Sequence, residues 1–273
     1  LIYHNITKQA AASYKQYRQS IAGGSYQVID ANIDELYEQF AYGINKHPVA
    51  IKNFVKYLID SLPAKPKYVF LLGKGIKKED LSAAYQVENF IPTMGIPSSD
   101  ALLVAGILSG TNTAIPDVPI GRFPAITNTE ALDYLEKVQQ HEATGLEDWK
   151  KRALHFVGGD NTNLTNLIAS YMSTYENLFE DTLIGGQVFT YQKNTTAPIQ
   201  TNISDSIIKT INNGASIINF FGHGSEQGFD QAIDDPSVFN NKNKYPLLIS
   251  NSCYSGNIYI YGRRSVSERY TYT

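Results

Sequence analysis

The chain has 273 residues, 42% of them hydrophobic and 12% aromatic, which is enough for one large domain or two ordinary ones. Its formal net charge of −3 shows no excess of basic residues, so nucleic acid is not an expected partner. No apolar run approaches the roughly 20 residues of a transmembrane helix, and one cysteine excludes an internal disulfide. Because the chain begins with Leu1 and not Met, we expect it to be a processed or excised part of a longer protein.

The first half of the chain alternates predicted strands and helices. In chain order, the pattern predicts a strand over Leu1–His4, a helix over Thr7–Ile21, a strand over Tyr26–Asp30, helices over Ile33–Tyr42 and His47–Ser61, and a strand over Tyr68–Leu72. Thr7 is the expected N-cap of the first helix. A looser stretch over 76–119 is followed by Ile120–Phe123 and then by a helix from Asn128 or Thr129 to about Thr144.

The second half repeats this alternation. It predicts strands over Ala153–Val157, Gln187–Tyr191, Ser216–Phe221 and Leu247–Asn251, with helices over Leu164–Phe179 and Ile199–Asn212. Strands separated by helices of this length indicate βαβ units and parallel sheets. We therefore predict two consecutive parallel-sheet α/β subdomains, 1–147 and 148–273, with the boundary inside 145–151.

Two of the predicted strands end in residues that can perform chemistry. The strand over Ser216–Phe221 runs into Gly222-His223-Gly224, and the strand over Leu247–Asn251 runs into Ser252-Cys253. Open α/β sheets place their sites outside the carboxyl ends of the strands. We therefore expect His223 and Cys253 to lie near each other at one edge of a sheet.

A cysteine with a histidine partner is a candidate nucleophile. A free thiol is only slightly ionised at neutral pH, and a nearby imidazole raises the thiolate fraction by stabilising the anion or taking the proton. The alternative interpretation is structural: Cys253 is then a small core residue and His223 a turn residue after a strand. The spacing alone leaves these two interpretations open.

Four segments in this order resemble motifs of the gingipain family of cysteine peptidases, peptidase family C25. They are Pro66-Lys67-Tyr68-Val69-Phe70-Leu71-Leu72-Gly73, Val118-Pro119-Ile120-Gly121-Arg122-Phe123-Pro124-Ala125, Phe221-Gly222-His223-Gly224-Ser225-Glu226 and Ser250-Asn251-Ser252-Cys253-Tyr254-Ser255-Gly256. The resemblance runs over nearly the whole chain. It implies a caspase-like, three-layer α/β/α second subdomain, preceded by a smaller related one.

The resemblance also implies a function, cleavage of protein or peptide substrates by a cysteine endopeptidase. Cys253 would attack the scissile carbonyl to form a thioester, and His223 would protonate the leaving amine. The backbone amides of Gly224 and Cys253 would hold the oxyanion. Asp117 is the best candidate for a third catalytic residue, and Asp100 is the second choice. An equally good interpretation of Asp117 is a carboxylate that stabilises a turn in a loop.

Three charged residues near the two motifs are candidate substrate-pocket residues: Glu226, Arg263 and Arg264. Two arginines ten residues beyond Cys253 would favour acidic or carboxylate-bearing substrates. No cofactor is required for the chemistry. The histidines lack a metal-ligand spacing, so a zinc site is not expected. Two clusters could bind a structural calcium ion through their oxygens, although neither has a recognisable calcium-loop pattern: Asp230, Asp234 and Asp235, and Asp160-Asn161-Thr162-Asn163.

Two other functions remain open. One is the sortase-type member of the type IX secretion system, which would use the same dyad for transpeptidation, and the other is a non-catalytic binding module. The resemblance implies a secreted or cell-surface bacterial protein, with secretion-system machinery as a further partner. It also implies that the catalytic subdomain continues beyond Thr273 with a further strand and helix, so we expect this chain to be truncated at its C-terminal end.

Overall fold

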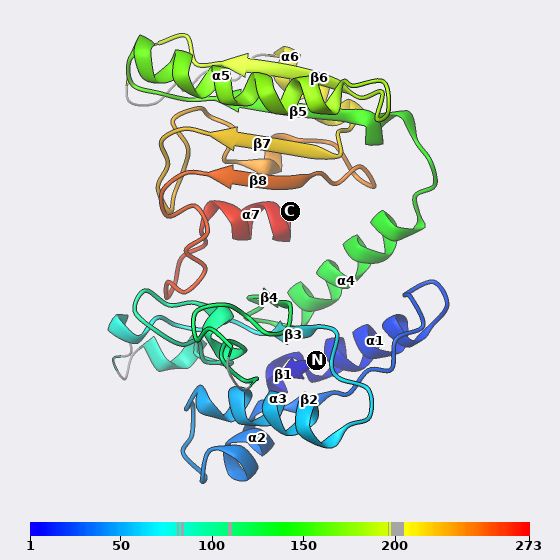
Figure 1. The fold of residues 1–273 in the computed structure, drawn as a ribbon, viewed down its shortest axis with the longest axis vertical. Helices are drawn as coiled ribbons and strands as arrows, with labels where there is room; N and C mark the ends of the chain where they lie inside the picture. Colours follow the sequence, from blue (N-terminus) through cyan, green and yellow to red (C-terminus); the bar gives the residue numbers. More distant parts are fainter. Residues whose placement is uncertain (81, 83–84, 109–110, 196, 198–204) are drawn as a thin grey trace. The chain divides into compact units, whose positions relative to one another are not determined.

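The computed structural model describes residues 1–80, 82, 85–108, 111–195, 197 and 205–273. These residues form two compact units (Figure 1). Unit 1 comprises Leu1–Glu136 with Ile258–Arg263, and unit 2 comprises Lys137–Asn257 with Arg264–Thr273. Each unit has a four-stranded, fully parallel sheet with flanking helices, which confirms the predicted α/β fold class. The boundary between 147 and 148 stays a prediction.

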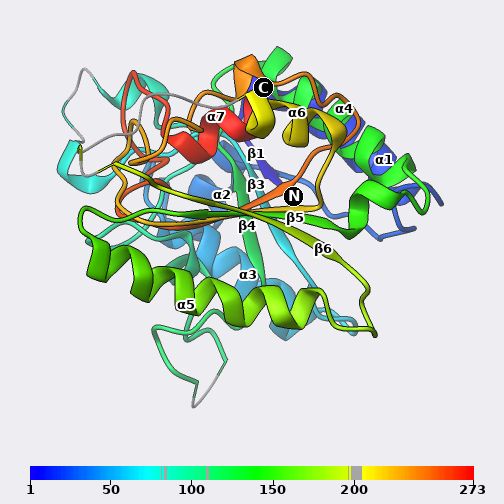
Figure 2. The same ribbon diagram turned by 90° about the horizontal axis from the view of Figure 1, so that it is seen from above.

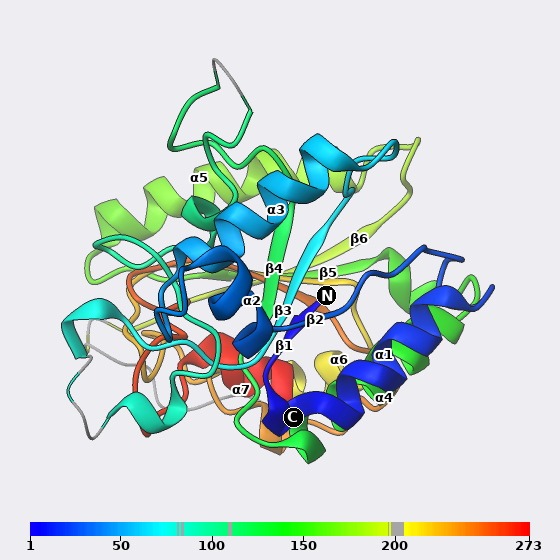
Figure 3. The same ribbon diagram turned by 90° about the horizontal axis from the view of Figure 1, so that it is seen from below.

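The sheet of unit 1 has the strand order β2-β1-β3-β4. Its elements are β1 (Ile2–Tyr3), α1 (Lys8–Gln19), β2 (Ala31–Asn32), α2 (Ile33–Phe40), α3 (Val49–Ser61), β3 (Val69–Leu72), β4 (Ile120–Phe123) and α4 (Asn128–Ala143), the last of which runs on into unit 2. Helices α2 and α3 lie on one face of the sheet, and α1 and α4 lie on the other (Figure 3).

Successive residues of β3 explain how both faces of this sheet are covered. Leu71 is fully buried in the core formed with α2 and α3. The side chain before it, Phe70, points to the other face and stacks on Tyr14 of α1, with 4.8 Å between ring centroids. This alternation is the period of two that a strand imposes on its side chains.

Two local predictions in unit 1 need correction. The strand predicted over Tyr26–Asp30 is wrong: the second strand is Ala31–Asn32, because β1 offers only two residues for pairing and these take Ala31 and Asn32. Thr7 does precede α1, but its hydroxyl does not cap the helix. It donates instead to the carbonyl of Leu72, 3.0 Å away, and so ties the helix start to β3.

The late segment Ile258–Arg263 packs as part of unit 1. The ring of Tyr259 lies 5.8 Å from the guanidinium carbon of Arg122, and burial raises the pKa of Tyr259 to about 12, as does the charge of Asp100. The buried Lys74 donates to the carbonyl of Arg263, 3.0 Å away. These contacts hold the segment in place.

The sheet of unit 2 has the order β6-β5-β7-β8. Its elements are β5 (Arg152–Val157), α5 (Thr162–Phe179), β6 (Gln187–Gln192), α6 (Asp205–Asn213), β7 (Ile217–Phe221), β8 (Leu247–Asn251) and α7 (Val266–Tyr272). The four predicted strands are confirmed to within a residue at each end. The predicted start of the helix over Ile199–Asn212 lies outside the described residues.

Helix α5 covers one face of this sheet, and α6 and α7 cover the other (Figure 2). The face toward α6 and α7 carries the larger core, in which Leu154, Phe156 and Phe220 are fully buried. Val157 points the other way and packs on Met172 of α5. The sheet is thus the middle of three layers, with its strand ends left free to hold a site.

Helix α7 was not predicted. Ser265 and Glu268 form a capping box, in which the Ser265 hydroxyl accepts from the Glu268 amide and the Glu268 carboxylate accepts from the Ser265 amide. The spacing Ser-x-x-Glu before an apolar position is a helix-start signal that sequence inspection can find. Among the described residues, no helix is long and apolar enough to cross a membrane.

Candidate active site

The register of β7 and β8 brings the two motif residues to the same edge of the sheet. Phe221, the last residue of β7, pairs with Asn251, the last residue of β8, in a parallel ladder. His223 and Cys253 each come two residues later. The amide of Gly222 donates to the carbonyl of Asn251 at 3.4 Å, so the strands are still held together where the loops begin.

The loop after β7 is a tight hairpin that presents His223. Gly224 bridges to Phe229, and the amide of Ser225 donates to the carbonyl of Gly228 at 2.8 Å. Phe229 is buried and stacks on Phe220, with 4.1 Å between ring centroids. The hairpin is therefore anchored in the core on one side, while the His223 side chain remains 54% exposed on the other.

The loop after β8 lies directly against this hairpin. A Cβ atom added to Gly224 would stand 2.7 Å from the Ser252 hydroxyl oxygen and 3.4 Å from the Cys253 carbonyl oxygen. Below the loop, the hydroxyl of Ser250 is 2.7 Å from that of Ser252 and 2.9 Å from that of Ser255. Cys253 is exposed and free, which argues against its interpretation as a small core residue.

Asp160, which the sequence offered only as part of a candidate calcium-binding cluster, stands beside the histidine. Asp160 Oδ2 lies 3.8 Å from His223 Nε2, an ion pair when the imidazole is protonated. Asp160 follows β5, which pairs with β7, so it reaches the same sheet edge. The strand-end rule that selected His223 and Cys253 also applies to Gly158-Gly159-Asp160, and this is the signal that could have found it.

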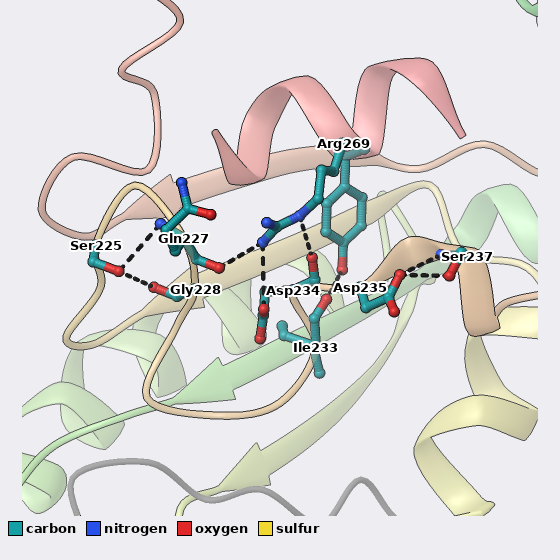
Figure 4. A network of polar contacts seen from close by, with 9 residues as sticks. Ser225, Gln227, Gly228, Ile233, Asp234, Asp235, Ser237 and Arg269 are labelled. Atoms are coloured by element: carbon teal, nitrogen blue, oxygen red, sulfur yellow. Dashed lines mark hydrogen bonds and ion pairs between the residues drawn. The ribbon is translucent and has the colours of Figure 1, made fainter. Parts of the chain in front are cut away.

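Helix α7 holds the far side of the loop that follows His223 (Figure 4). The guanidinium of Arg269 donates to the carbonyl of Gln227 at 2.7 Å and to the carbonyl of Asp234 at 3.0 Å, and it pairs with the Asp234 carboxylate at 3.3 Å. The hydroxyl of Tyr270 donates to the carbonyl of Ile233. These bonds fix 225–237 against a helix that shares the core of the sheet.

The two aspartates predicted as third catalytic residues, Asp117 and Asp100, have their hydrogen-bond partners within unit 1. Asp117 accepts from the amides of Ile107 and Leu108 at 2.6 and 3.2 Å and from the hydroxyl of Thr111 at 3.3 Å. Desolvation raises the pKa of Asp117, but these hydrogen bonds outweigh it and hold the pKa below its ordinary value. Asp100 forms a two-point pair with the buried Arg122. Both residues therefore have structural partners, and a catalytic role for either stays a prediction.

The predicted pocket residues fall in different surroundings. The Glu226 carboxylate accepts from the side-chain amide of Asn257 at 3.0 Å, which joins the histidine loop to the cysteine loop. Arg264, in unit 2, lies over the ring of Tyr272, with 3.7 Å from its guanidinium carbon to the centroid. Arg263 belongs to unit 1 and is exposed. Their pocket roles stay predictions.

The three aspartates of one candidate calcium cluster have separate partners. Asp230 lies beside Lys193, Asp234 pairs with Arg269, and Asp235 accepts from Ser237. Within the described ranges, no group of three His, Cys, Asp or Glu side chains is arranged to hold a metal ion. Calcium binding by either cluster stays a prediction.

Comparisons with known proteins support the α/β fold of this chain. Three solved structures match the whole chain: one described as the structure of a protease (TM-score 0.69, 18% identity), the Arg-specific cysteine proteinase gingipain R, RgpB (0.67, 20%), and the complex of the pro- and mature domains of Porphyromonas gingivalis RgpB (0.66, 21%). At these identities the likeness shows a shared fold. The chain spans 56%, 58% and 60% of those three chains.

No curated protein matches the chain. The model of peptidase family C25, in contrast, matches residues 1–273, the full sequence. The four motifs that resemble the gingipains lie within this match, and two of them place His223 and Cys253 at adjacent strand ends. The chain belongs to peptidase family C25.

Proposed function

We propose that this chain contains the catalytic centre of a cysteine endopeptidase, with Cys253 as nucleophile and His223 as its acid–base partner. The observation that supports this most is the pairing of Phe221 with Asn251, which delivers both side chains beyond the same edge of the sheet. Family membership supports the same assignment. Both side chains are exposed, so a polypeptide can reach them.

The reaction proceeds in two halves on these side chains. The Cys253 thiol gives its proton to His223 as its sulfur attacks the scissile carbonyl carbon, and the resulting tetrahedral oxyanion accepts hydrogen bonds from the amides of Gly224 and Cys253. Collapse breaks the C–N bond, and His223 gives its proton to the leaving amine. Water then attacks the thioester while His223 accepts a proton, and cleavage of the C–S bond releases the acid and restores the thiol.

We assign Asp160 the role of supporting the histidine. Its carboxylate lies 3.8 Å from Nε2 of His223, so it can form an ion pair with the imidazolium while His223 holds the proton destined for the leaving amine. Because the Asp160 side chain is 59% exposed, water screens this interaction, and we expect it to assist the reaction without being indispensable.

The test is labelling and cleavage by the intact protein. A peptide probe with a thiol-reactive group is expected to label Cys253, and Cys253→Ala and His223→Ala should each lose peptide cleavage. Labelling that persists unchanged in His223→Ala, or no labelling by any probe, would favour a binding module. With an amine acceptor present, a joined product in place of a free carboxyl group would indicate transpeptidation.

Membership of the family also supports a proposal about the location and partners of the protein. We infer protein or peptide substrates, a secreted or cell-surface location and contact with secretion machinery. Fractionation of the source bacterium with an antibody against this chain tests the location, and recovery in the cytoplasmic fraction alone would contradict it.

A further inference from the structure

Asp230 lies on the returning arm of the hairpin that presents His223. Only 3% of its surface is exposed, although it is an acidic residue. Its backbone amide donates to the carbonyl of His223 at 2.9 Å. The backbone of Asp230 thus fixes the main chain of the histidine directly.

The carboxylate of Asp230 reaches a second loop. Its Oδ2 atom accepts from the amide of Gly159 at 2.8 Å, and the residue after Gly159 is Asp160. The ammonium of Lys193, which follows β6, lies 3.6 Å from the same oxygen, and both side chains of this pair are almost completely buried. Asp230 therefore lies where the ends of three neighbouring strands, β6, β5 and β7, converge.

Two glycines leave the space that this carboxylate fills. A Cβ atom added to Gly158 would stand 2.5 Å from Asp230 Oδ1, and one added to Gly222 would stand 2.9 Å from the same oxygen. Both distances are too short for real atoms, so side chains here would displace the carboxylate. The glycines that open the Asp160 loop and the His223 loop are thus fitted to Asp230.

The buried pair of Asp230 and Lys193 is not the arrangement that would give the folded state its greatest stability. Removing a carboxylate and an ammonium from water has a cost that their attraction often fails to offset. In addition, Asp230 Oδ1 has no hydrogen-bond partner among the described residues. Buried charges that are incompletely satisfied are typical of functional sites, where position matters more than stability.

We propose that Asp230 is a positioning residue that holds the Gly159–Asp160 loop and the His223 loop in one arrangement, with Lys193 balancing its charge. The inference rests on the proposed function, because the two loops carry the residues assigned there to acid–base chemistry. Asp230 itself touches no reacting atom. Its side chain acts by fixing the main chain on which Asp160 stands.

Two readouts test this in the intact protein, the exchange rate of the Gly159 amide and the steady-state kinetics of peptide cleavage. Asp230→Ala should accelerate exchange at Gly159 and lower kcat by about 10- to 100-fold, the effect of misplacing a catalytic group, with little change in KM. Asp230→Asn keeps an oxygen that can accept from Gly159, so it should recover part of both. If loss of the carboxylate beside the buried ammonium of Lys193 prevents folding, Asp230→Ala is combined with Lys193→Met.

Asp181→Asn is the matched control. Like Asp230, Asp181 accepts from a backbone amide, that of Leu183 at 2.9 Å, but it lies outside both loops, so the variant should leave both readouts as in wild type. Unchanged Gly159 exchange or unchanged kcat in folded Asp230→Ala would overturn the inference. Failure of the proposed function gives a different result, because peptide cleavage would then survive in Cys253→Ala. In that case the exchange rate of the Gly159 amide would still report whether Asp230 holds the two loops.

Discussion

His223 Nε2 and Asp160 Oδ2 lie 3.8 Å apart at the ends of the neighbouring strands β7 and β5, and both side chains are more than half exposed to solvent. This exposure sets the size of the expected effect. An exposed ion pair contributes up to about 1 kcal/mol, so we expect Asp160→Asn to lower kcat/KM by roughly fivefold. His223→Ala removes the acid–base group and should cost about 10²- to 10⁴-fold.

Initial-rate kinetics on one peptide substrate measure both variants. The ionic-strength dependence separates them further, because salt screens the pair: the difference between wild type and Asp160→Asn should shrink at 1 M salt. An Asp160→Asn variant as inactive as His223→Ala would contradict the weak, screened role assigned here.

The contact between Gly224 and Ser252 predicts a steric effect on activity. In Gly224→Ala the new methyl group would meet the Ser252 hydroxyl at 2.7 Å and its Cβ at 2.8 Å, so the two loops must separate. We expect kcat/KM to fall at least about tenfold and stability to drop by about 1–3 kcal/mol. Gly256→Ala is the matched control, because nothing lies within 4 Å of its added methyl group.

Ser252→Gly provides a second check on this contact. It removes both atoms that the new methyl group would meet, so Gly224→Ala combined with Ser252→Gly should be more active than Gly224→Ala alone. Equal activity of these two variants would show that the loss does not arise from this overlap.

The buried guanidinium of Arg122 predicts a large stability effect in unit 1. It forms a two-point pair with Asp100 at 2.7 Å for each contact and donates to the carbonyls of Gly73 and Ile91 at 2.7 and 2.8 Å. The guanidinium also donates to the carbonyl of Pro92 at 3.2 Å, so Arg122→Met removes a donor from one carboxylate and three carbonyls. We expect the free energy of unfolding to fall by about 3–5 kcal/mol, measured by urea denaturation.

An exposed pair on α3 supplies the control for this measurement. Lys56 and Asp60 are 2.8 Å apart, and each side chain is more than half exposed. Lys56→Met should change the free energy of unfolding by no more than about 0.5 kcal/mol. A change in Arg122→Met as small as this would mean that its bonds are replaced by water.

His155 on β5 predicts a pH dependence of stability. Burial lowers the pKa of His155 below its ordinary value, although the charge of Glu180 acts in the opposite direction. The folded state therefore keeps the imidazole neutral where the unfolded chain, with a pKa of about 6.5, binds a proton. Stability should fall as the pH drops below about 6.5, by at most about 1.4 kcal/mol per pH unit, until the lower folded pKa is passed.

His155→Phe should remove this contribution. The substitution also eliminates Nδ1, a buried atom with no hydrogen-bond partner among the described residues, so it should not destabilise the fold at neutral pH. Denaturant unfolding at several pH values between 5 and 8 measures the difference from wild type. Parallel curves for the two proteins would show that His155 does not titrate on unfolding in this range.

Much of the fold was predictable because strands and helices leave periodic patterns in the sequence. The apolar runs of β5, β7 and β8 and the glycines after them fixed these strands closely. The two-residue strand β2 was misplaced, because such a short strand leaves no periodic signal. Helix α7 was missed although Ser265 and Glu268 mark its start.

For the candidate site, the sequence alone indicated which residues can perform chemistry and that His223 and Cys253 follow strand ends. It could not assign partners to carboxylates. The sequence does not distinguish the three loop aspartates Asp117, Asp100 and Asp160. In the folded chain, Asp117 accepts from backbone amides and Asp100 pairs with Arg122, whereas Asp160 lies beside His223. Strand order and register decided this, because they bring together groups that lie far apart along the chain.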